Sequence, residues 1–376
     1  MVNANPTGRT SAKWKAYEPD VLPLWVAEMD FPLAPVIADA LHDAIDRSDT
    51  GYRWVEGLPE ALAGFALRRL NWQVDPQHVI VLGDVLAAMS ETLGRLTPPA
   101  SSIVITPPVY PPFFSTVRRV IERPLVEVPL IDGRDLDLAG LAAAFARPDV
   151  SAFLLSSPHN PTGTIHSRET LEQVARLARA HGVTVVADEV WAPLPLHGRT
   201  VVPYLSLGEE LTGPDVSLIA ASKAFNLAGL KCAQVVAGSA ETAAALRERI
   251  PVEVTYSASQ FGVIASSTAY RDGDAWLDDT LTVLSANADL LAGLLSRRLP
   301  RVRYTPPEAS YLAWLDCRDL GLGDEPARVF RERGRVALNE GAEFGEQGRG
   351  FVRLNLATTP DVLEEAVVRM AAAVST

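Results

Sequence analysis

The chain has 376 residues, of which 48% are hydrophobic and 21% are charged, and its formal net charge is −12. This composition is typical of a globular enzyme, and the length accommodates two domains or one large α/β domain with an appendage. A disordered or fibrous chain is excluded. The acidic balance argues against nucleic acid as a partner, because phosphate binding requires a basic surface.

Three features predict a cytoplasmic protein. No apolar run approaches the length of a bilayer-spanning helix, so no membrane association is expected. The segment from Met1 to Lys15 is polar and lacks the apolar stretch of a secretory signal. Cys232 and Cys317 lie far apart without metal-type spacing, so we expect reduced, buried thiols and no bound metal.

We expect residues 1–46 to form an N-terminal arm and part of a small domain. This segment follows neither the period of a strand nor that of a helix. It is rich in tryptophan and proline, at Trp14, Pro23, Trp25, Pro32 and Pro35. Such a segment is expected to pack on the C-terminal module or on a second subunit.

Residues 47–280 are expected to form a large domain, because short apolar runs alternate with amphipathic stretches. This alternation predicts an α/β fold with a mainly parallel sheet and helices on both faces. The predicted strands are 79–82, 103–106, 125–130, 152–155, 183–188, 216–221 and 233–237, with helices over 85–96, 136–145 and 168–181.

Residues 281–376 are expected to form a smaller α+β domain. A long helical run extends from Ala275 to Leu299, and strand-like segments follow at 310–315 and 350–356. The last helix is predicted to begin at Pro360.

Polar side chains follow the carboxyl ends of several predicted strands of the large sheet, where ligands bind in open parallel sheets. In chain order these side chains are Tyr110, Asn160, Asp188 and Lys223. A further strand, 79–82, runs into Gly83 and the start of a helix. We therefore expect one binding site at this edge of the sheet.

Lys223 comes directly after the run 216–221 and before a turn-and-helix segment. A lysine held partly desolvated at such a position has a lowered pKa and can form a Schiff base with an aldehyde. Taken alone, a lysine at a strand end is more often solvated, protonated and unreactive. The surrounding motifs decide between these alternatives.

Four motifs resemble those of fold-type-I pyridoxal 5'-phosphate (PLP) enzymes of the class I/II aminotransferase superfamily. They are Asn160-Pro161-Thr162-Gly163, Asp188-Glu189, Ser222-Lys223 and Arg353-Leu354-Asn355. Other segments are similar to the MalY/PatB-type C–S lyases, also called cystathionine β-lyases, namely Lys13-Trp14, 23–31, 106–113 and 311–317. The similarity extends from about Lys13 to the C-terminus, and it implies the type I PLP-dependent transferase fold with a seven-stranded sheet.

The resemblance implies a role for each residue at the strand ends. Lys223 would hold PLP covalently and then act as general base at the substrate Cα. Asp188 would keep the pyridine nitrogen protonated, so that the ring can accept electrons. Asn160 would hydrogen-bond the O3′ oxygen of the ring, and Tyr110 would stack on the ring. A capping aspartate, an Asn-Pro turn and a packed tyrosine are the structural alternatives.

The phosphate of PLP would lie at a helix start. Backbone amides of Gly83, Asp84 and Val85 favour an anion there, with the side chain of Asp84 turned onto its own helix as an N-cap. Ser222 offers a hydroxyl. Lys231 offers positive charge where the wider superfamily often has an arginine, although a merely solvated Lys231 is the alternative.

Tyr52 resembles the tyrosine that reaches the phosphate of the neighbouring subunit. This resemblance implies a homodimer with a shared active site.

The substrate side of the site is expected around Arg353, which would bind the α-carboxylate of an amino acid in a bidentate pair. Asn160 and Trp25 would contribute to substrate binding. Residues that could line the pocket but are equally compatible with a structural role are Trp25, Tyr256, Ser257 and Asn355.

Two positions depart from the family pattern. Trp191 stands where MalY-like sequences often carry a histidine, and it could narrow the pocket, favour an apolar leaving group or only contribute to packing. Ala220 stands where many superfamily members offer a serine or threonine to the phosphate. These departures bear on substrate specificity.

The leading hypothesis is a PLP-dependent C–S β-lyase that cleaves cystathionine or a related cysteine S-conjugate to a thiol, pyruvate and ammonia. An aminotransferase on the same scaffold is the alternative, because both reactions need the same lysine, aspartate and arginine. A third hypothesis is a regulatory or binding protein that retains the fold, against which the intact Lys223, Asp188, Asn160 and Arg353 argue.

Overall fold

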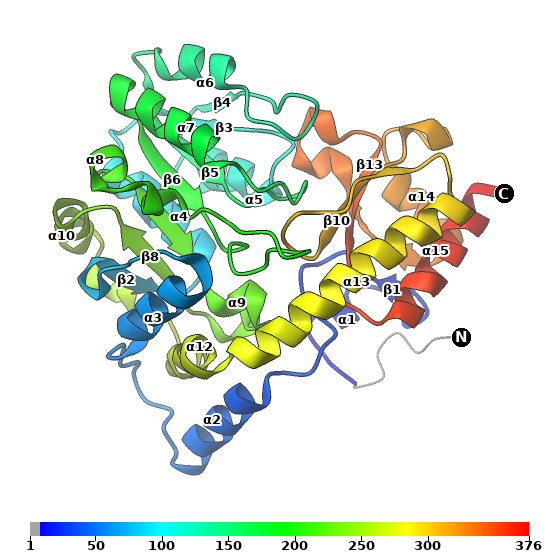
Figure 1. Ribbon diagram of the computed structural model, residues 1–376, viewed down its shortest axis with the longest axis horizontal. Coiled ribbons are helices and arrows are strands. Elements are labelled where there is room, and N and C mark those ends of the chain that lie inside the picture. The colour runs from blue at the N-terminus through cyan, green and yellow to red at the C-terminus, as the bar shows by residue number, and fades with distance from the viewer. Residues whose placement is uncertain (1–7, 376) are drawn as a thin grey trace.

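The computed structural model describes residues 8–375, and Figure 1 shows a large central sheet flanked by helices beside a smaller C-terminal sheet. Residues 1–7, which belong to the predicted arm and to the segment in which no secretory signal is expected, lie outside the described residues. Within residues 8–375, no helix combines the length and apolar character needed to cross a bilayer.

The large sheet has seven strands, as the sequence predicts, in the order β2-β8-β7-β6-β5-β3-β4. Strands β4, β3, β5, β6 and β7 pair in parallel, whereas β8 runs antiparallel to both of its neighbours. The strands are β2 (Val79–Leu82), β3 (Ser102–Ile105), β4 (Leu125–Glu127), β5 (Val150–Ser156), β6 (Thr184–Asp188), β7 (Val216–Ile219) and β8 (Ala233–Ala237). The predicted mainly parallel sheet is confirmed.

Helices cover both faces of this sheet because successive strand side chains point to opposite sides. Ile103 and Ile105 face the core shared with α4 (Val85–Leu96) and α10 (Ala240–Arg249), whereas Val104 belongs to the other core. That second core includes α6 (Leu138–Phe145) and α7 (Arg168–His181), together with α3 (Leu58–Leu70) and α12 (Gln260–Asp272). Both strand faces are apolar, which explains why the strands read as continuous hydrophobic runs.

Short helices connect these elements and place side chains at the sheet edge. They are α5 (Pro111–Ser115), α8 (Glu209–Thr212), α9 (Ala221–Ala224) and α11 (Val252–Thr255). The π-helical turn η2 (Thr116–Val120) and the 3₁₀ turns η1 (Pro76–His78), η3 (Tyr204–Leu207), η4 (Ala228–Leu230), η5 (Arg318–Leu320), η6 (Gly341–Phe344) and η7 (Glu346–Gly348) complete the connections.

The C-terminal part contains a four-stranded antiparallel sheet in the order β12-β13-β10-β9. Its strands are β9 (Arg303–Tyr304), β10 (Leu312–Asp316), β12 (Asn339–Glu340) and β13 (Phe351–Asn355), and α14 (Pro326–Gly334) and α15 (Pro360–Ser375) pack beside it. Helix α13 (Asp274–Arg298) runs unbroken through the expected boundary at residues 280 and 281 and contacts α15 (Figure 1).

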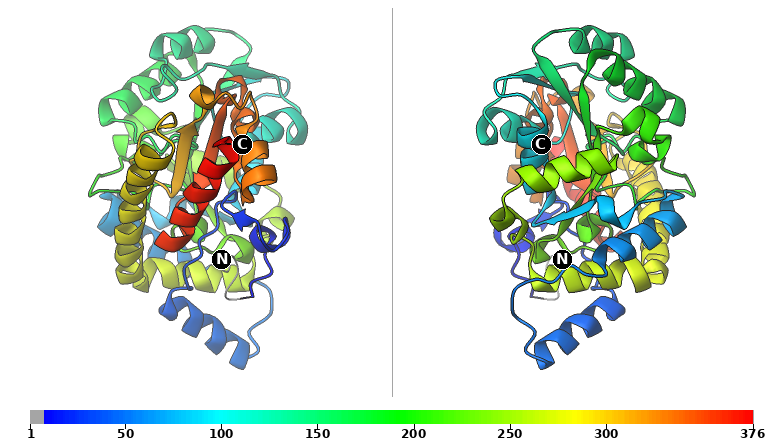
Figure 2. Two further views of the ribbon diagram at one scale, coloured as in Figure 1. Left: turned by 90° about the vertical axis from the view of Figure 1, so that its right-hand side faces the viewer. Right: turned by 90° about the vertical axis from the view of Figure 1, so that its left-hand side faces the viewer.

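The N-terminal arm packs on the C-terminal module, as expected. Strand β1 (Leu22–Pro23) pairs in parallel with β11 (Val336–Ala337). Figure 2 shows the dark-blue N-terminal segment, with α1 (Ala12–Lys15), beside the orange and red C-terminal elements. Helix α2 (Pro35–Asp46) leaves this module and packs against α12.

Candidate active site

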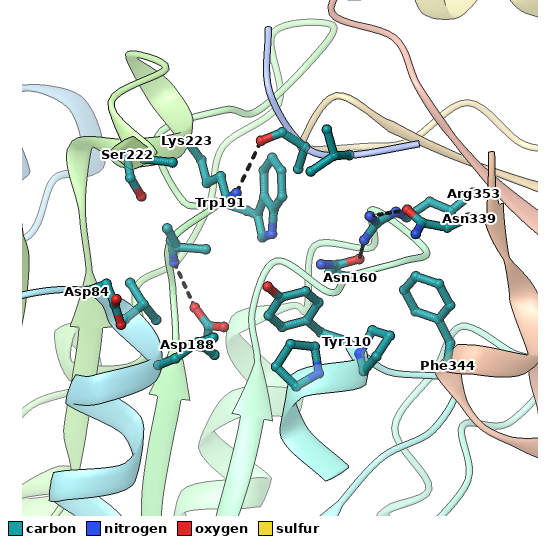
Figure 3. A pocket seen from close by; sticks show the side chains of 18 of the residues that line it. Asp84, Tyr110, Asn160, Asp188, Trp191, Ser222, Lys223, Asn339, Phe344 and Arg353 are labelled. Carbon is teal, nitrogen blue, oxygen red and sulfur yellow. Dashed lines mark hydrogen bonds between the residues drawn. The ribbon is translucent and has the colours of Figure 1, made fainter. Parts of the chain in front are cut away.

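A cavity of about 440 Å³ opens at the carboxyl ends of the parallel strands, between the large sheet, the small sheet and the arm (Figure 3). It brings together nearly all of the residues predicted from the sequence. Those that line it are Trp25, Gly83, Asp84, Val85, Tyr110, Asn160, Asp188, Ser222, Lys223, Lys231 and Arg353. These side chains thus lie together at the expected edge of the sheet.

Lys223 reaches the cavity from α9 rather than from a strand, because β7 ends at Ile219 and the chain turns into a helix at Ala221. Its Nζ donates a hydrogen bond of 3.2 Å to the carbonyl oxygen of Ala27. Burial lowers the pKa of Lys223 to about 8, and the charge of Arg353 acts in the same direction. At pH 7 about a tenth of this amine is therefore uncharged, far more than of a lysine with the ordinary pKa of 10.5.

Asp188 ends β6 and is buried, with one carboxylate oxygen accepting a 3.3 Å hydrogen bond from the amide of Val190. Burial raises its pKa to about 6, although the charge of Lys223 opposes the shift. Figure 3 shows Asp188, Tyr110 and Asn160 facing the same open space. A buried carboxyl at this point can hold or share a proton with a basic atom placed in that space.

Tyr110 and Asn160 are joined through their backbones. The amide of Tyr110 donates to the carbonyl of Asn160 at 3.1 Å, which fixes the start of α5 against the loop after β5. Burial raises the pKa of Tyr110 above its ordinary value, so its hydroxyl stays protonated at neutral pH. The ring thus presents an uncharged flat surface to the cavity.

Arg353 enters the cavity from the centre of β13 and is buried. Its guanidinium donates to Asn160 Oδ1 at 3.1 Å, to Asn339 Oδ1 at 2.5 Å and to the carbonyl of Trp25 at 3.4 Å. Its carbon Cζ lies 4.9 Å from the centroid of the Phe344 ring. Burial lowers the pKa of Arg353 to about 10, which still leaves the side chain charged at neutral pH.

One donor of Arg353 is unused. Its Nε is buried and has no hydrogen-bond partner among the described residues. A buried N–H without a partner is costly, so this atom favours binding of an acceptor such as a carboxylate.

The opposite end of the cavity lies at the start of α4. Asp84 caps this helix by accepting from the amide of Ala87 at 2.9 Å, which confirms the predicted N-cap. Its other oxygen pairs with Lys231 Nζ at 2.8 Å. Lys231 is thus paired with Asp84 in this structure.

Gly83 is required at its position for a steric reason. Its amide donates to Ser257 Oγ at 2.9 Å, and a Cβ atom there would lie 2.8 Å from the carbonyl oxygen of Ser257. Ser257 therefore supports the backbone at Gly83 and is not among the residues that line the cavity. This is the structural role that the sequence left open for it.

Tyr52 does not line the cavity of its own chain. It is 91% exposed and contacts Tyr256 edge to face, with ring centroids 6.1 Å apart. Asn355 and Tyr256 likewise lie outside the residues that line the cavity.

Sequence reasoning missed several lining residues. Asn339 and Phe344 come from the short elements β12 and η6, where the chain shows no motif. Ala27 acts through its backbone carbonyl, which no side-chain pattern reveals. The only sequence signal was the similarity of the segment 23–31 to the MalY/PatB-type proteins.

The two departures from the family pattern lie beside Lys223. Trp191 is buried, contacts Tyr311 edge to face with centroids 4.9 Å apart, and has its ring centroid 5.8 Å from Lys223 Nζ. It both packs and lines the cavity. Ala220 is buried just before α9 and supplies no hydroxyl group.

A second buried acid stands behind Asp188. Glu189 accepts hydrogen bonds from the amide of Tyr204 at 2.7 Å and from the hydroxyl of Ser217. Burial raises its pKa from 4.5 to about 7. Burial also raises the pKa of Asp215, whose carboxylate accepts a hydrogen bond from the hydroxyl of Tyr204.

The raised pKa of Glu189 predicts a pH-dependent stability. A carboxyl with a higher pKa in the folded than in the unfolded chain contributes most to stability below its unfolded value, and that contribution is lost as pH rises through its folded value. The contribution of Glu189 to the free energy of unfolding should therefore fall between about pH 4.5 and 7, and this contribution is absent in Glu189→Gln. Urea denaturation at pH 5 and pH 8 measures the free energy of unfolding of both proteins. An equal change between the two pH values in wild type and in Glu189→Gln would contradict the prediction.

Comparisons with known proteins agree with this geometry. Residues 19–370 match the family model for aminotransferase class I and II. A Mycobacterium leprae protein assigned as a cystathionine beta-lyase is 45% identical, with 96% of this chain and 94% of that protein covered. The cystathionine beta-lyase PatB of Bacillus subtilis is 34% identical, with 98% and 97% covered.

A solved structure shows the same fold over almost the whole chain. It is the crystal structure of a Corynebacterium diphtheriae protein assigned as a PLP-dependent beta-cystathionase. The TM-score is 0.93 at 34% sequence identity, with 97% of this chain and 96% of that chain covered. The chain therefore belongs to the aminotransferase class I and II family and, within it, to the group of MalY/PatB-type proteins.

Proposed function

We propose that this protein is a PLP-dependent C–S β-lyase that cleaves cystathionine or a related cysteine S-conjugate to a thiol, pyruvate and ammonia. The observation that carries the proposal is the convergence of Lys223, Asp188, Asn160, Tyr110 and Arg353 on one cavity. The relatives named as cystathionine beta-lyases cover nearly the full chain and support the same reaction.

The residues of the cavity fit PLP. An amine with a pKa of about 8 lies close to a buried carboxyl and a flat uncharged ring, and a helix N-terminus with a hydroxyl lies at the other end. When bound, PLP supplies an aldehyde that an amine can attack and a ring that accepts electrons from the substrate Cα.

Lys223 has two tasks in this proposal. Its uncharged amine is the nucleophile toward the aldehyde, and after release it removes the proton from the substrate Cα. Its lowered pKa serves both tasks, because a fully protonated lysine could do neither. Loss of the thiolate from Cβ follows removal of this proton.

Three other side chains would position the ring. Asp188 holds a proton on the ring nitrogen, and Asn160 donates to the ring oxygen O3′ while its own oxygen stays bonded to Arg353. Tyr110 packs against the face of the ring. Together these contacts would hold the ring in one orientation beside Lys223.

We place the phosphate group at the start of α4, near Gly83, Asp84 and Val85, with the hydroxyl of Ser222. Lys231 is tied to Asp84, so its charge offsets that of the carboxylate. This pair lowers the repulsion that Asp84 would otherwise exert on a phosphate.

Arg353 would bind the α-carboxylate of the substrate, and its unpaired Nε supports this role. Trp25 borders the same part of the cavity and holds Arg353 through its carbonyl. Replacement of Arg353 by lysine keeps the charge but removes the planar pair of donors.

We expect Arg353→Lys to lower kcat/KM for cystathionine about 10- to 100-fold, mainly through KM, because one charge-assisted hydrogen bond contributes about 1.5–3 kcal/mol. Steady-state kinetics measure this change. Arg349→Lys is the matched control, since Arg349 is exposed and paired with Glu346. An unchanged KM in Arg353→Lys would remove this residue from the substrate site.

We also propose a homodimer in which Tyr52 completes the partner's phosphate site. The ring contact of Tyr52 with Tyr256 and the hydrogen bond from Arg53 to the carbonyl of Thr255 bring segments 52–54 and 252–256 together. Large exposed side chains of these two segments are Tyr52 (91%), Trp54 (72%), Val252 (58%) and Tyr256 (55%). Exposed patches of this kind mark interfaces. The buried free cysteines are consistent with the cytoplasmic location that we propose.

Light scattering should give a mass about twice the 40.5 kDa of one chain. Trp54→Asp places a charge in the patch and should shift the protein toward monomer while weakening cofactor binding. A wild-type protein that stays at 40.5 kDa at all concentrations would contradict the shared site.

The proposed reaction is tested by incubating the PLP-loaded protein with L-cystathionine and measuring thiol and pyruvate. The lyase releases both without any keto acid. Turnover that occurs only when a keto acid is added would instead identify an aminotransferase.

A further inference from the structure

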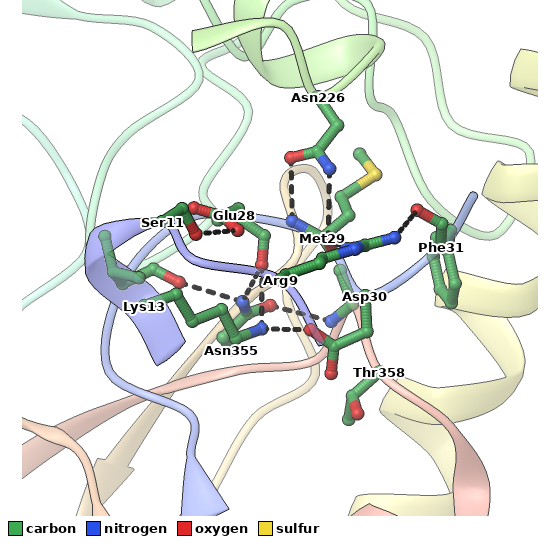
Figure 4. Close-up of polar contacts among 12 residues, drawn as sticks. Arg9, Ser11, Lys13, Glu28, Met29, Asp30, Phe31, Asn226, Asn355 and Thr358 are labelled. Carbon is green, nitrogen blue, oxygen red and sulfur yellow. Dashed lines mark hydrogen bonds and ion pairs between the residues drawn. The ribbon is translucent and has the colours of Figure 1, made fainter. Parts of the chain in front are cut away.

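Residues 25–31 of the N-terminal arm, which we call the strap, have irregular backbone, and the first three of them line the cavity. Figure 4 shows that side chains from distant segments donate hydrogen bonds to strap carbonyl groups. From β13, Asn355 Nδ2 donates to the carbonyl of Val26 at 2.9 Å and to that of Glu28 at 2.7 Å. Side chains thus hold the strap where a neighbouring strand would otherwise do so.

Lys223 forms a hydrogen bond to the strap at the carbonyl oxygen of Ala27. Lys223 Nζ lies 3.2 Å from this oxygen, and the hydroxyl of Tyr311 donates to the same oxygen at 3.1 Å. An uncharged amine has two hydrogens and one lone pair. Donation of one hydrogen to Ala27 therefore restricts where the lone pair of Lys223 can point.

Asn226 anchors the strap to the loop that carries Lys223. It lies three residues after Lys223 in the chain and adopts a left-handed conformation, with φ of 58°. Its Oδ1 accepts from the amide of Met29 at 2.9 Å, and its Nδ2 donates to the carbonyl of Met29 at 3.0 Å. This two-point contact joins the strap and the Lys223 loop into one unit.

Lys13 anchors the strap from the other side. Its side chain is fully buried, and its Nζ donates to the carbonyl of Glu28 at 2.9 Å and forms an ion pair with Asp30 (Figure 4). Removal of one partner from a buried pair leaves an uncompensated charge, so the strap would move or admit water to solvate Asp30.

We propose that Asn226 and Lys13 are positioning residues that hold the strap over Lys223, so that the Ala27 carbonyl orients the amine and the strap excludes water from it. Both act through the strap and touch neither substrate nor cofactor in this scheme. The proposal rests on the proposed function of Lys223 and adds the elements that prepare its amine.

The groups that face Lys223 determine in which direction its pKa should change when the strap is released. Removal from water is the main cause of its lowered pKa, and Arg353 of β13 acts in the same direction. Asp188 of β6 and Glu28 of the strap oppose the shift. Release of the strap restores hydration of the amine and should raise the pKa of Lys223 toward its ordinary value of 10.5.

The test measures acetylation of Lys223 as a function of pH in the full-length protein freed of PLP. Modified peptides are resolved by mass spectrometry, which is simple because the lysines of the chain are Lys13, Lys15, Lys223 and Lys231. In Asn226→Ala and in Lys13→Met, the midpoint of Lys223, which is the pH at which its acetylation is half-maximal, should rise by about one unit. Acetylation of the exposed Lys15 serves as the internal reference. In the loaded enzyme, the acid side of the pH profile of kcat should move upward in the same variants.

Asn287→Ala is the matched control. Asn287 is buried and its Nδ2 donates to the carbonyls of Leu356 at 2.9 Å and Thr358 at 2.8 Å, so its loss removes two similar bonds outside the strap. This variant should be less stable than wild type but keep the midpoint of Lys223.

Hydrogen exchange of the strap amides reports whether each substitution releases the strap. Faster exchange together with an unchanged Lys223 midpoint in Asn226→Ala would overturn the proposal, as would an equal rise in Asn287→Ala. If Asn226→Ala does not fold, Lys13→Met decides by the same criteria. The acetylation and hydrogen-exchange measurements use no substrate, so failure of this proposal is distinct from failure of the lyase reaction.

Discussion

Lys223→Ala should abolish both covalent attachment of PLP and turnover of cystathionine, with kcat reduced by about 10³-fold or more. The substitution removes the nucleophile toward the aldehyde and the base at Cα in one step. Borohydride reduction of the loaded protein, followed by peptide mapping, measures attachment. Steady-state pyruvate release measures turnover.

Lys231→Ala is the control for this experiment, because Lys231 lines the same cavity but is paired with Asp84. It should keep borohydride-reducible cofactor at Lys223 and bind PLP more weakly. Cofactor that remains covalently attached in Lys223→Ala would refute the assignment of the attachment site.

Asp188→Asn should lower kcat by about 10²-fold or more while leaving the cavity intact. Asparagine has the shape of the aspartate but cannot hold a proton on the ring nitrogen, so electrons from Cα are accepted less well. The charge of Asp188 also matters because the residue is buried and acts on Lys223. Kinetics with a saturating concentration of PLP separate this effect from weaker cofactor binding.

The neighbouring acid provides a matched control for Asp188. Glu189 is buried but points away from the cavity, toward Tyr204 and Ser217. Glu189→Gln should retain most of the activity and change mainly the pH dependence of stability. Equal losses of kcat in the two variants would show that Asp188 has no special contact with the ring.

Much of the fold could be predicted because its strands are short, apolar and buried on both faces. Strand 79–82 and strand 233–237 were predicted with the bounds that the structure has. Strand 125–130 ends early, at Glu127, because its partner β3 ends at Ile105, which pairs with Glu127. The antiparallel direction of β8 could not be predicted, since direction leaves no trace in the sequence of a strand that is buried on both faces.

The side chains of the site were predictable where strand ends and motifs coincide, as at Asp188 and Lys223. Arg353 was predictable because a central arginine is an unusual choice for a buried strand. Asn339 was not, because it lies in a two-residue strand without a motif. The strap could not be predicted from side chains, because it acts through backbone carbonyl groups that Asn226 and Lys13 hold in place.

Other expectations stay predictions. They are the domain limits at residues 46 and 280, the reach of Tyr52 into a partner subunit, and the roles of Ser222 and Val85 toward a phosphate.

The central claim is most directly tested by the number of turnovers that the PLP-loaded protein completes with cystathionine and no keto acid. The account predicts continuous release of thiol, pyruvate and ammonia in equal amounts over many turnovers. An aminotransferase without an acceptor converts only about one substrate molecule per active site, because its two half-reactions alternate. Arrest at that point, with no pyruvate formed, would contradict the account.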